Sequence, residues 1–295
     1  MKHWICLIAL VGIVACTEKP PFIDLAEPVP VEAGLVDTSF IVTEIPSPQD
    51  RVVFIEDFSG VQCVNCPKGN AKVAEIVEEH PGRVIGLTLH AGEFAVPFGN
   101  NISKEEFVTE ETVDLDGFLG IQVYPSITID RHAFNGEVPI TGQFINTWNI
   151  LAEERLEVPT PVNLTLSQTY NEADSTYRIR FEAVYTQDVA DEAHNYSIFL
   201  AESGIVDAQL SSDTELYPPN GLIREYVHDH VVRDMITPSL GNSLTSENLV
   251  EGLSIIKEFK LTLDENWVAD NMEIIAIVHN SGELKEIIQA KKIGL

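Results

Sequence analysis

Two cysteines separated by two residues, Cys63 and Cys66, are the residues of this sequence best suited to covalent chemistry. Thiols in this C-x-x-C spacing can close a disulfide, exchange it with another molecule, or supply two ligands to a metal ion. A structural zinc needs four ligands, and the sequence contains no second C-x-x-C. Thiol–disulfide exchange is therefore the leading interpretation, and a static disulfide and metal binding are the alternatives.

The residues around the pair predict a strand, a helix and a second strand. Residues 52–55 and 84–89 are short apolar runs typical of buried strands, and 68–79 carries apolar residues at helical spacing. Such a unit implies two parallel strands, with the cysteines at the carboxyl end of the first, where α/β folds place chemistry. The positive end of a helix dipole favours a thiolate. We therefore expect Cys63 to be the exposed attacking thiol and Cys66 the buried resolving thiol.

Further features resemble the thioredoxin fold. Tyr124-Pro125, before a later strand-like segment, resembles the cis-proline loop that faces the C-x-x-C in that family, keeps metal away from the thiols and shapes the substrate groove. Asp57 lies where thioredoxin-like proteins often keep a buried acid that exchanges protons with the resolving cysteine, although Glu56 is an alternative inward residue. The two residues between the cysteines, Val64-Asn65, depart from that family's usual pair. The resemblance thus predicts the fold, and it predicts neither the redox potential nor the direction of exchange.

Three histidines are further candidates for the site. His90 follows the second predicted strand, and we expect it either to favour the Cys63 thiolate or to bond a neighbouring loop. His228 and His230 would share one face of a strand, which suits a metal, but without a visible third ligand a polar loop is the preferred interpretation. We predict neither a metal nor a cofactor, and the sequence has no P-loop, dinucleotide-binding turn or serine-hydrolase elbow.

The N-terminus predicts export. Within residues 1–15, an apolar stretch is too short to span a bilayer but has the length of a signal-peptide core. Ile13-Val14-Ala15-Cys16 resembles a bacterial lipobox, which predicts cleavage before Cys16 and attachment of lipid to its sulfur. Plain secretory cleavage and a retained anchor helix are the alternatives. Residues 16–48 are rich in proline and are expected to form a flexible spacer.

The remaining chain is predicted to form two domains. Residues 49–158 are expected to form an α/β thioredoxin-like domain, with later helices beginning near Ser103 and near Gln143. The proline-rich segment 158–161 marks the boundary. Residues 159–295 are expected to form an all-β, immunoglobulin-like sandwich of roughly seven strands, because apolar and polar residues alternate along them.

The charge balance excludes some classes of partner. The chain has 46 acidic and 18 basic residues and a formal net charge of −28. Nucleic-acid binding requires positive charge that displaces counterions from phosphates, and a polybasic hold on anionic lipid requires the same. We therefore expect no nucleic-acid partner and a self-repelling, soluble surface.

Several sequence blocks resemble a narrower group: Ile55–Gly60, Cys63–Pro67, Leu89–Gly92, Tyr124-Pro125 with Asp130-Arg131, and Tyr226–Arg233. They are similar to the twenty-eight-kilodalton outer-membrane-protein family of lipoproteins, known mainly from Bacteroidota. That resemblance implies a lipid-anchored outer-membrane protein of the cell envelope, on either face of the membrane. Two functions stay open: disulfide exchange with exported proteins, or a non-catalytic binding lipoprotein whose Cys63–Cys66 disulfide is structural. The sequence predicts no oligomeric state.

Overall fold

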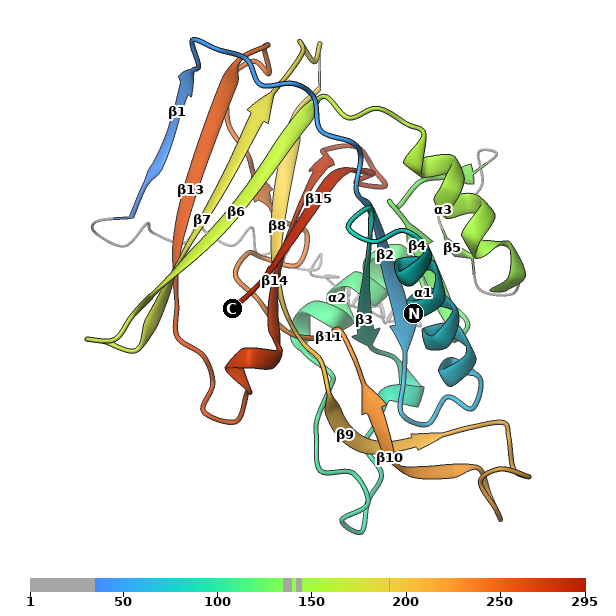
Figure 1. Ribbon diagram of the computed structural model, residues 1–295. Helices are drawn as coiled ribbons and strands as arrows, with labels where there is room; N and C mark the ends of the chain where they lie inside the picture. Colours follow the sequence, from blue (N-terminus) through green and yellow to red (C-terminus); the bar gives the residue numbers. More distant parts are fainter. Residues whose placement is uncertain (1–34, 135–139, 142–144, 191) are drawn as a thin grey trace, which may run out of the picture.

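The computed structural model describes residues 35–134, 140–141, 145–190 and 192–295. The protein is rich in β-structure, with few helices and with sheets that contain both parallel and antiparallel strands (Figure 1). The predicted signal peptide, Cys16 and most of the predicted spacer lie outside the described residues.

The predicted strand–helix–strand unit is present in the first half of the chain, by which we mean the residues before 159; the second half is 159–295. β2 (Val53–Ser59) leads into α1 (Cys66–Glu79) and then into β3 (Val84–His90), which pairs parallel to β2. All residues of both strands are buried, which explains their nearly continuous apolar sequences. β4 (Ser126–Ile129) pairs antiparallel with the other side of β2, and β5 (Ile140–Thr141) pairs with β4.

Two further helices cover this part of the sheet. α2 (Glu110–Leu119) begins later than the Ser103 region predicted, because Thr109 and Thr112 form the capping box that starts it. α3 (Trp148–Leu156) begins after the predicted Gln143 and buries Trp148 against α1 and β4. Gly120 ends α2 with a φ of 66°, a left-handed conformation that favours glycine.

One nine-stranded sheet extends through both halves of the chain. Its order is β15-β14-β8-β11-β3-β2-β4-β5, with β12 on β8. β11 pairs parallel to β3 through Val231 and Thr88, and antiparallel to β8 through Val231 and Glu202. The second-half strands are β8 (His194–Glu202), β11 (Val231–Met235), β12 (Asn242–Ser243), β14 (Met272–Asn280) and β15 (Ile287–Gly294). The division of the chain at residue 159 therefore stays a prediction, because hydrogen-bonded strands connect the two sides of that boundary.

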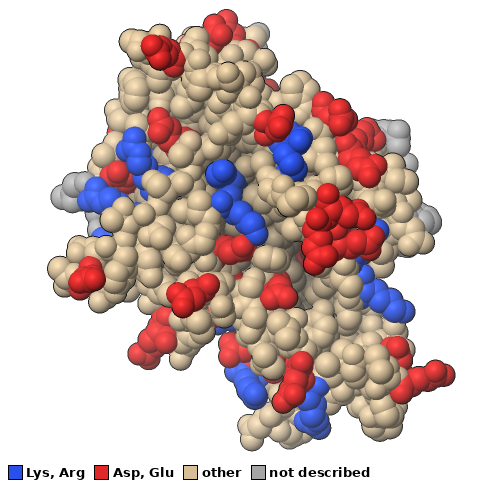
Figure 2. All heavy atoms as spheres, in the orientation of Figure 1, with Lys and Arg blue, Asp and Glu red and all other residues tan. Residues whose placement is uncertain are grey.

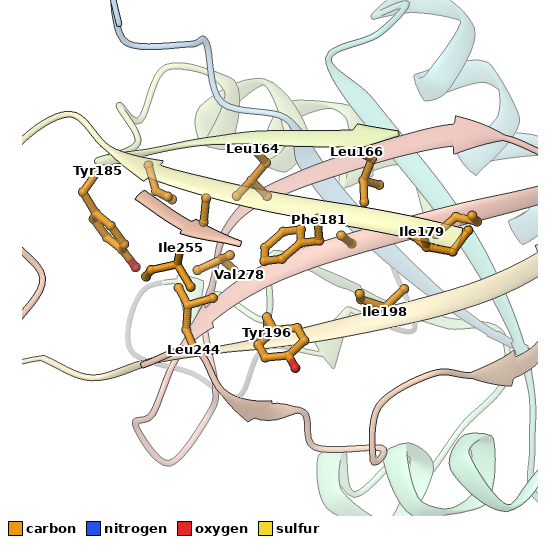
Figure 3. Close-up of a cluster of buried hydrophobic side chains, with 14 of the residues drawn as sticks. Leu164, Leu166, Ile179, Phe181, Tyr185, Tyr196, Ile198, Leu244, Ile255 and Val278 are labelled. Atoms are coloured by element: carbon orange, nitrogen blue, oxygen red, sulfur yellow. The ribbon is translucent and has the colours of Figure 1, made fainter. Parts of the chain in front are cut away.

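A four-stranded antiparallel sheet packs against β8 and β14. Its order is β1-β13-β7-β6, and its strands are β1 (Asp37–Ile41), β6 (Val162–Asn171), β7 (Thr176–Tyr185) and β13 (Leu253–Leu261). Figure 3 shows how the two sheets share a core, in which Phe181 of β7 lies among side chains of β6, β8 and β14. Phe181 stacks on Tyr196 with ring centroids 5.6 Å apart. Residues 37–41, which we expected in the flexible spacer, are instead the edge strand of this sheet.

A two-stranded hairpin is inserted between β8 and β11. It consists of β9 (Ile205–Leu210) and β10 (Leu222–His228), which pair only with each other in the described sheets. In Figure 1 it projects below the carboxyl ends of β2 and β3. The second half thus contains more strands than the seven predicted.

Buried ion pairs hold the first half together and attach it to β15. Arg131 donates to the Glu56 carboxylate from Nε and Nη2, at 2.9 and 2.5 Å, and both side chains are fully buried. Asp130 accepts hydrogen bonds from Arg51 and Arg155, each at 3.0 Å. Arg51 also donates to the Ile287 carbonyl of β15, so this network joins residues far apart in the sequence.

Acidic side chains dominate the surface. On the face in Figure 2, Lys and Arg occur singly or in small groups among Asp and Glu, without a continuous basic patch. This distribution agrees with the net charge of −28 and gives a polyanion no footprint on that face. Among the described residues, no helix combines the length and the apolar character needed to cross a bilayer.

The buried pair between Glu56 and Arg131 gives a first prediction. Replacing Glu56 with Gln leaves the Arg131 guanidinium buried without its counter-ion, which we expect to lower the free energy of unfolding by about 3 kcal/mol or more. Glu75→Gln removes a solvent-exposed pair with Lys72, and its cost is expected to stay below about 1 kcal/mol. Urea denaturation of both variants measures the difference, and equal costs would contradict the structural role of the buried pair.

Candidate functional site

The two cysteines of the C-x-x-C form a disulfide. The Cα atoms of Cys63 and Cys66 are 5.4 Å apart, and Cys66 is the first residue of α1, followed by Pro67 in its first turn. Cys66 has no exposed surface and Cys63 retains 4%. The predicted pairing is therefore confirmed, whereas Cys63 is far less exposed than the sequence led us to expect.

The loop that contains Pro125 lies against the first turns of α1. The Tyr124–Pro125 peptide bond is cis, as the resemblance implied. A Cβ atom built on Gly69 would come within 2.8 Å of the Pro125 Cβ, so a glycine at this position lets the proline approach the helix. Tyr124 closes the other side of the loop through a hydrogen bond to Asp116 and a ring contact with Phe94.

Asp57 is a buried acid beside the disulfide. Asp57 is 1% exposed, and its Oδ1 has no hydrogen-bond partner among the described residues. The Asn70 amide donates both to Asp57 Oδ2, at 3.1 Å, and to the Cys66 carbonyl, at 2.8 Å. Burial raises the pKa of Asp57 to about 7. Because Glu56 is paired with Arg131, Asp57 is the acid that lies next to the cysteines.

His90 lies in an aromatic cluster at the end of β3. Its ring centroid is 4.7 Å from that of Phe107 and 5.4 Å from that of His228, and neither ring nitrogen has a partner in the part of the chain described. Burial, with His228 as a second cause, lowers the pKa of His90 to about 3. A neutral imidazole at pH 7 supplies no positive charge to a thiolate, so we leave His90 out of the proposed chemistry.

His228 and His230 do not act as a pair. His228 is buried beside His90, whereas His230 is bound to Glu273 at 2.7 Å. Within the described ranges, no three His, Cys, Asp or Glu side chains are grouped so that they would hold a metal ion.

The β9–β10 hairpin binds the C-x-x-C loop, residues 60–66. The sequence does not predict this contact. Leu210 N donates to the Val61 carbonyl at 2.8 Å, and Ser212 N donates to the Val64 carbonyl at 2.7 Å. A hairpin signal is visible in the sequence, because alternating segments flank the turn-forming residues Pro218-Pro219-Asn220-Gly221. No local pattern, however, places that hairpin next to residues so much earlier in the chain.

The raised pKa of Asp57 predicts that replacing this residue makes the protein more stable, and that the gain increases with pH. The native state binds this proton more tightly than the unfolded chain does, so the contribution of Asp57 to stability decreases as the pH rises from about 4 to about 7. Asp57→Asn removes this dependence, and we expect the variant to be about 2–4 kcal/mol more stable than the wild type at pH 8 and similar to it at pH 4.

Urea denaturation at a series of pH values measures this effect, with the exposed Asp50→Asn as the control. A stability difference between Asp57→Asn and the wild type that does not change with pH would contradict the assigned environment.

Comparisons with known proteins place the chain in a family. A search of curated proteins found no match. Among solved structures, HBP35 of Porphyromonas gingivalis is 22% identical with a TM-score of 0.61, over 83% of this chain and 76% of that one. A protein of Agrobacterium tumefaciens is 12% identical with a TM-score of 0.50, over 83% and 95% of the two chains.

A domain of the outer membrane lipoprotein Omp28 from Porphyromonas gingivalis is also similar, at 12% identity over 46% and 88% of the two chains, with a TM-score of only 0.30. The family model described as outer membrane protein Omp28 matches residues 114–295, which is more than half of the sequence. The chain therefore belongs to the Omp28 family of outer membrane proteins.

Proposed function

We propose that the protein is an envelope thiol–disulfide exchange protein that acts on the cysteines of exported proteins. In this proposal residues 49–158 form a thioredoxin-like domain and 159–295 an immunoglobulin-like sandwich. The parallel pair of β2 and β3, the antiparallel β4 and β5, and the cis Pro125 against α1 support the first assignment. The packing of the four-stranded sheet on β8 and β14 supports the second.

The environment of Asp57 is the observation that carries the redox proposal. A buried carboxyl without a counter-ion is costly, and a disulfide that serves only as a brace has no need of one. With a pKa of about 7, Asp57 can either give or take a proton near neutral pH. The Asn70 amide fixes it beside Cys66, the thiol that must gain a proton when the disulfide opens.

The exchange then proceeds in two steps. A thiolate of the exported protein attacks the Cys63 sulfur, a mixed disulfide forms, and the Cys63–Cys66 bond breaks so that Cys66 leaves as a thiolate and takes the proton of Asp57. A second thiolate of the exported protein attacks its own sulfur in the mixed disulfide and releases Cys63. The exported protein loses two electrons to the cysteine pair, and the reverse sequence reduces a disulfide.

A second candidate function rests on the burial of the pair. Cys63 is only 4% exposed and the hairpin binds its loop, as expected if the disulfide braces the first half of a binding lipoprotein. Such a protein would bind its partner through the second half. It differs from the first candidate in requiring no reactive Cys63.

We further propose that lipid on Cys16 attaches the protein to the outer membrane. The proposal covers both the periplasmic and the outer face of that membrane. The description of the Omp28 family as outer membrane proteins supports the location. Cys16 lies outside the described residues, so its lipidation rests on the sequence. The first described residues, from 35 onward, lead into edge strand β1.

Trapping of mixed disulfides tests the exchange reaction. In Cys66→Ser the pair cannot close, so the free Cys63 thiolate attacks a disulfide of an exported protein and expels one of its two sulfurs as a thiolate. Residue 66 then has no thiol to release the mixed disulfide on Cys63, so covalent adducts with exported proteins are expected to accumulate. Non-reducing gels of envelope fractions, followed by mass spectrometry of the adducts, measure them. Cys63→Ser is the matched control and is expected to yield at least about tenfold fewer adducts, because Cys66 has no exposed surface.

The bracing alternative predicts the opposite outcome. Neither single variant would then form adducts above background, and the double variant Cys63→Ser/Cys66→Ser would retain the cellular phenotype of the wild type. That combination of results would overturn the exchange function.

A further inference from the structure

Gln209 of β9 contacts the C-x-x-C loop through its side chain. The side chain is fully buried, and Nε2 donates to the Gly60 carbonyl at 3.2 Å and to the Cys63 carbonyl at 3.1 Å. The Cys63 carbonyl also accepts the Cys66 N–H, at 3.3 Å. Gln209 therefore binds the carbonyl of the Cys63–Val64 peptide group, which lies inside the loop that the disulfide closes.

Tyr226 of β10 contacts the acid side of the same site. Its hydroxyl is hydrogen-bonded to the Asn70 side chain, whose amide bridges Asp57 and the Cys66 carbonyl. Burial and the charge of Asp57 raise the pKa of Tyr226, so its hydroxyl remains a neutral hydrogen-bonding group at pH 7. Gln209 thus contacts the Cys63 carbonyl directly, and Tyr226 is linked to the Cys66 carbonyl through Asn70.

The hairpin is itself fixed at its base. The Asp207 carboxylate accepts the backbone N–H groups of Lys104 and Glu105 at 3.0–3.1 Å, and the ring of His228 packs on Phe107 at 4.7 Å. These contacts attach β9 and β10 to residues 104–107, so the positions of Gln209 and Tyr226 do not depend on the disulfide loop alone.

We propose that the β9–β10 hairpin completes the redox site, with Gln209 and Tyr226 as positioning residues that set the equilibrium and the proton chemistry of the Cys63–Cys66 disulfide. The proposal rests on the proposed exchange function and extends it, because it assigns control of the pair to residues of the second half. Gln209 holds the loop in the geometry in which the two sulfurs are bonded. Tyr226 holds Asn70, and through it Asp57, beside Cys66.

Each residue has a separate consequence. Without Gln209 the reduced loop gains freedom, the two thiols meet less often, and the disulfide becomes easier to reduce. Without the Tyr226 hydroxyl, Asn70 is held less firmly, and the proton exchange between Asp57 and Cys66 shifts along the pH scale. A residue that contributes only to stability would alter neither quantity.

The experiment uses the full chain equilibrated with reduced and oxidised dithiothreitol, with the disulfide fraction measured by thiol alkylation and mass spectrometry. Gln209→Leu is expected to raise the equilibrium constant for reduction at least about tenfold, which corresponds to about 30 mV for a two-electron couple. Gln168→Leu on β6, far from the disulfide in the fold, is the matched control and is expected to stay within about twofold of the wild type.

Tyr226→Phe tests the proton chemistry without removing the ring. The midpoint of the pH profile of the exchange rate is expected to shift in Tyr226→Phe, and the shift is expected to vanish when Asp57→Asn is combined with it. Tyr170→Phe, which removes the hydroxyl of an exposed tyrosine on β6, is the control. Because Tyr226→Phe deletes a single oxygen atom, it keeps the proposal testable even where Gln209→Leu fails to fold.

The outcomes separate this proposal from the exchange function. Gln209→Leu and Tyr226→Phe that both match the wild type in equilibrium constant and pH profile would overturn the positioning role, whatever the wild type does. A Cys66→Ser variant that traps no exported protein, combined with shifted Gln209→Leu and Tyr226→Phe variants, would instead overturn the exchange function and leave the positioning role in place.

Discussion

The pairing of Val231 with both Thr88 and Glu202 is the constraint on which the site depends. It inserts β11 between β3 and β8 and makes one sheet of strands from both halves of the chain. Because Glu202 and Val231 are paired, the segment between them must leave the sheet and return at the same point. That point is the carboxyl end of β3, so the β9–β10 hairpin is held beside the C-x-x-C loop.

The site around the disulfide consequently contains residues from both halves of the chain. The first half contributes the cysteines, Asp57 and the cis Pro125, and the second half contributes the residues that bind the loop. Burial dominates the chemistry of this site, since it raises the pKa of Asp57 and lowers that of His90. The acidic surface plays no part in these shifts, because exposed charges are screened by solvent and salt.

Much of the first half was predictable because its signals are local. The apolar runs of β2 and β3, the helix after Cys66 and the cis Pro125 follow from spacing and from the resemblance to the thioredoxin fold. The position of Asp57 as the inward acid next to the cysteines was predictable only as one of two alternatives. Its distinction from Glu56 required Arg131, which lies far along the chain.

The contacts that sequence reasoning missed are long-range. Strand β1 lies in the segment whose prolines predict a spacer, its five residues are mostly exposed, and its pairing partner β13 follows more than 200 residues later. The contact between Gln209 and Cys63 likewise joins residues 146 apart. Pairing over such distances depends on the topology of the sheet, which periodicity does not reveal.

The reduction potential of the Cys63–Cys66 disulfide tests the central claim most directly. A working exchange couple is expected to have a potential above about −300 mV, measured in the wild-type chain against a dithiol of known potential. A value below about −300 mV would identify a structural bridge and would contradict the account of the cysteines as a redox couple.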